Sequence, residues 1–314
     1  MTLTLTRIRG PGFALTAVTA AFSAMLLSAN LATPLYAVWA KQFGFSTALL
    51  ALIFAVYALV LIPALLLFGQ LSDRLGRRPV IGIGLWFVPE TAERQPGGLR
   101  IRRPHVPREI RGAFIRVGLT GAAVWAVAGL FLSVMPSYAG QLVLHSRNLA
   151  LLALVAALIL VMSCATQLAL RRGAPPAQAQ AAGLALLAAG LLALVLAAPA
   201  QSAALLIVGA ILAGAGHGAA VLAAQDDLTR LAPGGQRAEV SAAFYVCVYL
   251  GVAVPAIGIG VLAVATTLFT AVTTFAAVTG ALALTVAAWH LRDRGQPPAM
   301  EDREKSLVPG HAAS

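Results

Sequence analysis

The chain has 314 residues, of which 60% are hydrophobic and only 11% are charged. A soluble domain carries about 25% charged residues, so the polar side chains here are too few to cover a water-soluble protein. The formal net charge of +11 does not indicate nucleic-acid binding, because the cations lie in short segments between long apolar blocks. The composition therefore predicts an integral membrane protein.

The apolar blocks predict about eight membrane-spanning helices, since a helix needs roughly 20 apolar residues to cross a bilayer core. Helices are expected because the blocks lack the alternation of barrel strands. Two blocks are long enough for two spans each, and we place their turns at 199–202 and 262–267. The spans expected in this all-α, polytopic bundle are residues 13–37, 48–70, 113–135, 149–170, 179–199, 203–224, 240–262 and 267–290.

A further apolar segment, residues 79–89, is too short to cross, because a helix rises only about 1.5 Å per residue. If both ends of this segment lie in the cytoplasm, every Lys and Arg except Lys41 and Arg147 lies on the cytoplasmic side. That distribution satisfies the positive-inside rule, whereas a crossing would move the arginine-rich loop outside. We therefore expect the segment to return to the cytoplasm, where both termini also lie.

Two polar stretches separate or follow the predicted bundles. Residues 89–112 are rich in arginine, which predicts a cytoplasmic linker. Anionic lipid is a compatible partner, at about 1 kcal/mol per cation near the membrane surface. Residues 292–314 are polar and rich in turn formers, which predicts a disordered cytoplasmic tail.

The turn after the second span carries the most specific motif in the chain. Gly69 permits a close helix approach, Gly76 permits a positive φ, and Asp73 is surrounded by arginines. The full sequence is Gly69-Gln-Leu-Ser-Asp73-Arg74-Leu-Gly76-Arg77-Arg78-Pro79. This order resembles the signature loop of the major facilitator superfamily, which in that family joins the second and third spans.

Other segments extend the resemblance and reveal a gap in it. Residues 30–36 look like the end of the family's first span, and residues 214–218 and 249–255 look like parts of its tenth and eleventh. Residues 88–91, Val-Pro-Glu-Thr, look like the opening of the loop that follows the sixth span, yet they lie close behind the signature loop. The resemblance thus implies an incomplete fold in which roughly spans three to six are absent and residues 79–89 are a fused remnant.

This reading divides the chain into two bundles. The incomplete amino-terminal bundle comprises residues 1–88, and a complete six-span carboxyl-terminal bundle comprises residues 113–291. The resemblance implies a secondary active transporter of a small molecule in the inner or plasma membrane, working by alternating access. The expected transport includes proton-coupled efflux, with antiport and symport as the two alternatives.

The resemblance also implies which residues act. The family's cavity is lined by the first, fourth, seventh and tenth spans, so Asn30, Trp125 and His217 are candidate substrate-binding residues. Tyr245, on the eleventh span, is a further candidate. A gating role is carried onto the signature loop, at Gly69, Asp73, Arg74, Gly76, Arg77 and Arg78.

Each candidate has a purely structural alternative. Asn30, Trp125 and Tyr245 also suit helix packing, and the glycines beside His217 equally suit a crowded helix crossing with the ring bonded to a carbonyl. His217 is the clearest ionisable residue within the predicted spans. A second charge set, residues 226–239, is expected in a solvated loop.

Two other functional classes remain to be weighed. Because the acidic residues lie in loops, tails or span ends, a transport-inactive remnant or a membrane scaffold of the same family is the alternative function. The chain lacks the His-Glu-x-x-His and Gly-x-Ser-x-Gly motifs of hydrolases, so no enzyme activity is expected, and no cofactor or metal site either.

Overall fold

The computed structural model describes residues 105–170, 176–233 and 236–292, together with nine isolated positions between residues 42 and 63. Within the three long ranges all regular structure is helical. The first two predicted spans lie almost entirely outside the described residues, as do the short segment 79–89, most of the linker, and the tail beyond residue 292.

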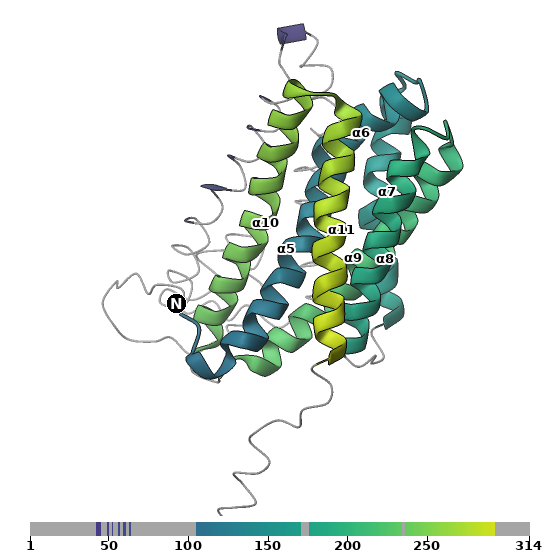
Figure 1. Ribbon diagram of the computed structural model, residues 1–314. Coiled ribbons are helices and arrows are strands. Elements are labelled where there is room, and N and C mark those ends of the chain that lie inside the picture. Colours follow the sequence, from purple (N-terminus) through teal and green to yellow (C-terminus); the bar gives the residue numbers. More distant parts are fainter. Residues whose placement is uncertain are drawn as a thin grey trace, which may run out of the picture.

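Six long helices of the described chain are apolar enough to cross a membrane, and they run side by side along one axis (Figure 1). Their bounds lie within three residues of the six spans predicted from residue 113 onward, except at the end of α9. In chain order the elements are η2 (Arg108–Ile110), α5 (Arg111–Ser133), α6 (Met135–Tyr138), η3 (Ala139–Val143), α7 (Leu149–Leu170), α8 (Pro176–Ala197), α9 (Ala203–Leu231), α10 (Arg237–Ala265) and α11 (Leu268–Arg292).

Both turns expected inside the long apolar runs are present. Ser202 follows the turn after α8 and caps α9, its hydroxyl accepting a hydrogen bond from the Leu205 amide at 3.3 Å. Thr266 and Thr267 separate α10 from α11, and the Thr267 hydroxyl accepts from the Thr270 amide at 3.1 Å. Hydroxyl side chains therefore supply the helix caps where the sequence has no strong turn residue.

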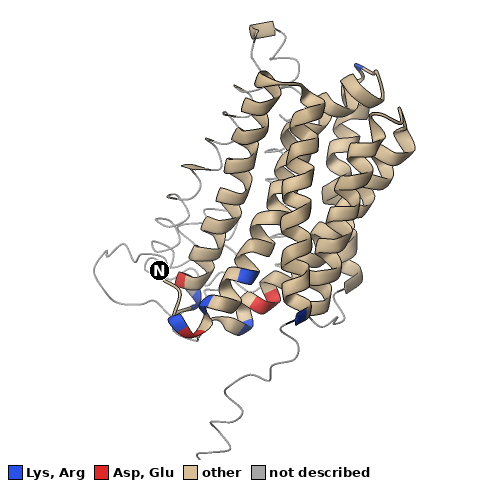
Figure 2. Cartoon of the chain, viewed as in Figure 1, with Lys and Arg blue, Asp and Glu red and all other residues tan. Residues whose placement is uncertain are grey.

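Helix α9 is longer than predicted, which corrects the position of three charged residues. Asp226, Asp227 and Arg230 lie in its last turns and not in a loop. The predicted span ended at the first charge because a charge marks the edge of the hydrocarbon core, but the backbone hydrogen bonds of a helix do not end there. Charged side chains gather at this end of the bundle (Figure 2), which we name the charged end.

Small residues let the helices approach closely. A Cβ built at Gly216 of α9 would lie 2.4 Å from the Gly183 carbonyl oxygen of α8, and one at Gly190 would lie 2.4 Å from the Ala213 nitrogen. On another face of α9, a Cβ at Gly218 would lie 2.4 Å from the carbonyl oxygen of Ser163 in α7. Helix α9 is thus packed backbone to backbone against both α7 and α8, as small residues permit in membrane bundles.

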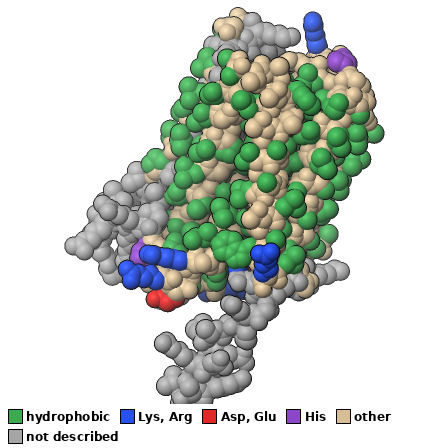
Figure 3. All heavy atoms as spheres, viewed as in Figure 1, with side chains coloured by type: hydrophobic (Ala, Val, Ile, Leu, Met, Phe, Trp, Pro, Cys, Tyr) green, Lys and Arg blue, Asp and Glu red, His purple; other side chains and the backbone are tan. Residues whose placement is uncertain are grey.

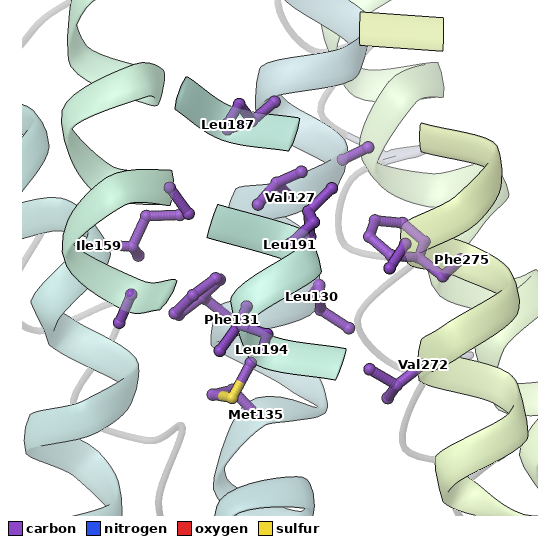
Figure 4. Close-up of a cluster of buried hydrophobic side chains, with 14 of the residues drawn as sticks. Val127, Leu130, Phe131, Met135, Ile159, Leu187, Leu191, Leu194, Val272 and Phe275 are labelled. Carbon is purple, nitrogen blue, oxygen red and sulfur yellow. The ribbon is translucent and has the colours of Figure 1, made fainter. Parts of the chain in front are cut away.

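The apolar interior lies between α5, α7, α8 and α11. Figure 4 shows Phe131 of α5, Ile159 of α7, Leu191 of α8 and Phe275 of α11 pointing toward one another. On the face drawn in Figure 3, hydrophobic side chains lie along the length of the helices, as lipid contact requires. The described structure is therefore that of a multi-pass membrane protein.

A polar cluster ties four helices together at the charged end. The Gln180 side chain of α8 is fully buried and donates a hydrogen bond to Asp227 Oδ2 of α9. The charge of Arg116 on α5 interacts with that of Asp227, and the Arg116 guanidinium lies 5.9 Å from the centre of the Trp289 ring of α11. Asp227 is therefore part of the bundle's packing, which corrects the expectation of a solvated loop.

Replacing Gly216 with alanine should destabilise the folded bundle, because the new methyl group would overlap the α8 backbone. Overpacking of this kind costs about 1–3 kcal/mol. Thermal unfolding in detergent, followed by circular dichroism, would measure the change. Gly258→Ala is the matched control, since a Cβ there meets nothing within 4 Å; it should leave the midpoint unchanged or raise it. Equal midpoints for the two variants would contradict the close packing.

Replacing Asp227 with alanine should also lower stability, by about 1–3 kcal/mol, because it leaves the buried Gln180 amide without its acceptor. Asp227→Asn keeps an acceptor oxygen and should cost less. The neighbouring Asp226 is exposed, so Asp226→Ala provides the control and should be nearly neutral. Similar losses for Asp226→Ala and Asp227→Ala in the same unfolding assay would refute the role given to the Gln180 bond.

Candidate functional site

The strongest candidate site lies near the middle of the bundle, where three helices bring polar and aromatic side chains together. Trp125 lies on α5, His217 on α9, and Ser163 and Gln167 lie one turn apart on α7. Trp125 and His217 are two of the residues selected from the sequence. The resemblance predicted that their helices correspond to the family's seventh and tenth spans, and the structure brings the two helices into contact at these residues.

His217 is buried and is held on one side by a hydrogen-bond chain. Its side chain is only 3% exposed, and its Nδ1 atom lies 2.9 Å from the Ser163 hydroxyl. Gln167 Nε2 donates to the same hydroxyl at 3.0 Å. The ring partner foreseen from the sequence was a carbonyl; the structure places a serine hydroxyl there instead.

The other ring nitrogen of His217, Nε2, is buried without a hydrogen-bond partner among the described residues. Leaving such a group unpaired costs about 1–3 kcal/mol, and native structures contain few of them. The closest aromatic neighbour is Trp125, whose ring centre lies 5.6 Å from that of His217 at an interplanar angle of 71°. One ring nitrogen is therefore fixed by Ser163, while the other is a buried polar atom without a described partner, on a ring that packs T-shaped against Trp125.

The glycines around His217 explain how the ring reaches Ser163. A Cβ at Gly214 would lie 2.7 Å from the Met162 Cβ, and a Cβ at Gly218 would overlap the Ser163 backbone. Only the missing side chains let α9 come this close to α7. The sequence suggested a crowded helix crossing with a hydrogen-bonded histidine as the alternative to a substrate contact. The structure shows both the crossing and the hydrogen bond.

Trp125 lies where three hydrophobic clusters meet. It packs against all three of the hydrophobic clusters in the described structure. One cluster fills the interior around α8, a second contains Phe244 and Val248 of α10, and the third is the pair Val252 and Ala253 on the same helix. The indole is therefore a packing element that joins three clusters, as well as a neighbour of the His217 ring.

Of the remaining predicted site residues, the structure describes Tyr245, which it does not place in this cluster. Tyr245 of α10 is 43% exposed, and its ring contacts the neighbouring Phe244 edge-on. Asn30 and the signature loop, residues 69–79, lie outside the described residues. Ser163 and Gln167 were missed by sequence reasoning, although two hydrogen-bonding side chains four residues apart in an apolar span were a usable signal.

Comparison with known proteins identifies the family. The model of the Major Facilitator Superfamily matches residues 15–89 and 85–256, together well over half of the chain. The comparisons with curated proteins and with solved structures give no match. The motif resemblance, the six membrane-capable helices and the family match agree: this chain belongs to the major facilitator superfamily and is a multi-pass membrane transporter of that family, not an enzyme.

Proposed function

We propose that the chain is a secondary active transporter that moves a small molecule by alternating access, with Trp125 and His217 as the side chains that contact the substrate. The observation that carries the proposal is the unpaired, buried Nε2 atom of His217 beside the Trp125 ring. Alternating access in transporters exposes a site near the bilayer midplane to each side in turn. His217 lies near the middle of α9, which suits such a site.

Proton coupling and efflux are the finer parts of this proposal. The acidic side chains of the described residues, at positions 109, 226, 227 and 239, lie in η2, the last turns of α9 or the first turn of α10. His217 is therefore the residue that we assign to proton exchange within the described spans, since its imidazole ring can both gain and lose a proton. Asn30, on the first span, would face the same cavity.

The gate is assigned to the signature loop, at Gly69, Asp73, Arg74, Gly76, Arg77 and Arg78. In this proposal Asp73 faces the amino end of α10, near residues 238–241, where the helix dipole favours a carboxylate. The shortened amino-terminal bundle is part of the same proposal. The two matched segments overlap at residues 85–89, so the family model does not run through this stretch as a single alignment. This supports a junction there between two parts of the family's fold.

The membrane orientation follows from the charges. The charged end of the six-helix bundle carries most of the described cations, and Arg147 precedes α7 at the other end. We propose that the charged end is cytoplasmic, with both termini on that side of the inner or plasma membrane. The arginine-rich linker then lies against the anionic leaflet.

Transport is tested by flux into proteoliposomes, using panels of drugs, sugars and amino acids with and without a proton gradient. The intact chain should move at least one compound, faster with the gradient. His217→Ala and Trp125→Ala should lower the initial rate at least tenfold, since each removes one wall of the site. His145→Ala alters an exposed histidine in the loop before α7 and should leave the rate unchanged.

The alternative function has its own signature in this assay. A chain that inserts and unfolds cooperatively, yet moves no compound under either condition, would be a transport-inactive member or a membrane scaffold. Equal flux in the His217→Ala variant and the intact chain would instead contradict the proposed binding site, while the proposal that the chain is a transporter would still hold.

Topology is tested with Gln95→Cys, in a background where Cys164 and Cys247 are replaced by serine. A membrane-impermeant thiol reagent should label position 95 only from the cytoplasmic face, because the short segment returns to the side from which it came. The labelling is read by mass shift in intact cells and in inverted vesicles. Labelling in intact cells would place the linker outside and reverse the proposed orientation.

A further inference from the structure

The hydrogen-bond chain from α7 determines where the proton of the His217 ring lies. A serine hydroxyl donates one hydrogen bond and accepts two, and a neutral imidazole donates from one nitrogen and accepts at the other. Gln167 Nε2 is a donor, so it occupies an acceptor position on the Ser163 oxygen. The remaining partner of that oxygen among the described residues is His217 Nδ1.

Two proton arrangements satisfy these distances, and they differ in what they leave unpaired. If Nδ1 carries the proton, the Ser163 hydroxyl hydrogen has no described acceptor, although the side chain is only 2% exposed. His217 Nε2 is then an unmet acceptor as well. If the hydroxyl donates to Nδ1, the Ser163 hydrogen and the Nδ1 acceptor are both paired, and the Nε2–H donor of His217 is the one group of the three left unpaired. The second arrangement leaves fewer buried groups unpaired and is favoured for that reason.

We infer that Ser163 and Gln167 are positioning residues that hold His217 as an Nε2–H donor aimed at a substrate acceptor beside Trp125. The inference rests on the proposed function and names its substrate class: an uncharged molecule with an apolar body and a carbonyl-type oxygen. The apolar part follows from the Trp125 surroundings, which include Val252 and Ala253. A charged ligand would meet no countercharge from the neutral imidazole.

A purely structural histidine accounts less well for this geometry. The glycine contacts already hold α9 against α7 through backbone atoms, so the hydrogen bond is not needed to join the two helices. The bond also orients the ring so that its other nitrogen is buried and unpaired. The neighbouring Trp125 ring satisfies an N–H group only weakly, whereas a carbonyl oxygen gives a full hydrogen bond.

The tautomer is tested by nitrogen NMR on the full chain labelled with ¹⁵N-histidine in lipid nanodiscs, with the His217 signals assigned by their loss in His217→Phe. The expected spectrum has Nε2 protonated and Nδ1 bare. Ser163→Ala should convert this to averaged tautomers, and Ser163→Thr, which keeps the hydroxyl, should restore it. Gln167→Leu should give a smaller change in the same direction.

The matched control is Ser133→Ala, which removes another hydroxyl from a membrane helix, one bonded to the Gly129 carbonyl of its own helix at 2.6 Å. It should leave the His217 signals unchanged. A proton on Nδ1 in the intact chain, or an unchanged tautomer in Ser163→Ala, would overturn the inference. These spectra require no transport, so the inference and the proposed function fail separately.

The substrate class is tested with two probes of nearly the same shape, acetophenone and α-methylstyrene, in which a CH₂ group replaces the carbonyl oxygen. Acetophenone should shift the Nε2 resonance in a saturable way, and its half-saturation should rise at least tenfold in Ser163→Ala. The hydrocarbon should cause no such shift. Equal responses to both probes would refute acceptor recognition, whereas an acetophenone shift without any flux would uphold the inference and count against transport.

Discussion

The close approach of α9 to its neighbours is the constraint on which the rest of the structure depends. Glycines on different faces of this helix place its backbone against α7 on one side and against α8 on the other. Side chains of ordinary size would move these helices apart, and His217 would then lose its hydrogen bond to Ser163. The geometry of the candidate site is therefore a consequence of missing side chains, since a hydrogen bond depends steeply on distance.

Much of the fold could be predicted from the sequence because the bilayer imposes a fixed length on each apolar run. The spans beginning at residues 113 and 149 were placed to within two residues of α5 and α7. The end of α9 was misplaced, because charges report where the hydrocarbon core stops and not where the helix stops. The same cause placed Asp227 in a loop, although its contact with Gln180 gives it a role in helix packing.

The site could be predicted only in part, and the reason is physical. His217 is conspicuous because an ionisable side chain is expensive within a membrane span. Ser163 and Gln167 give a weaker signal, since hydroxyl and amide groups are common in membrane helices and commonly bond within their own helix. Which helix face meets His217 depends on the rotation of α7 about its axis, and that rotation is set by packing that no local pattern encodes.

The position of Trp125 gives the site a mechanical property. The indole touches all three hydrophobic clusters, two of which contain residues of α10, and α10 packs mainly on the helix that carries Trp125. A molecule that displaced the indole would weaken the packing of α10 and of the apolar interior around α8 at the same time. Through this one side chain, a displacement next to His217 would reach α10 by packing contacts alone.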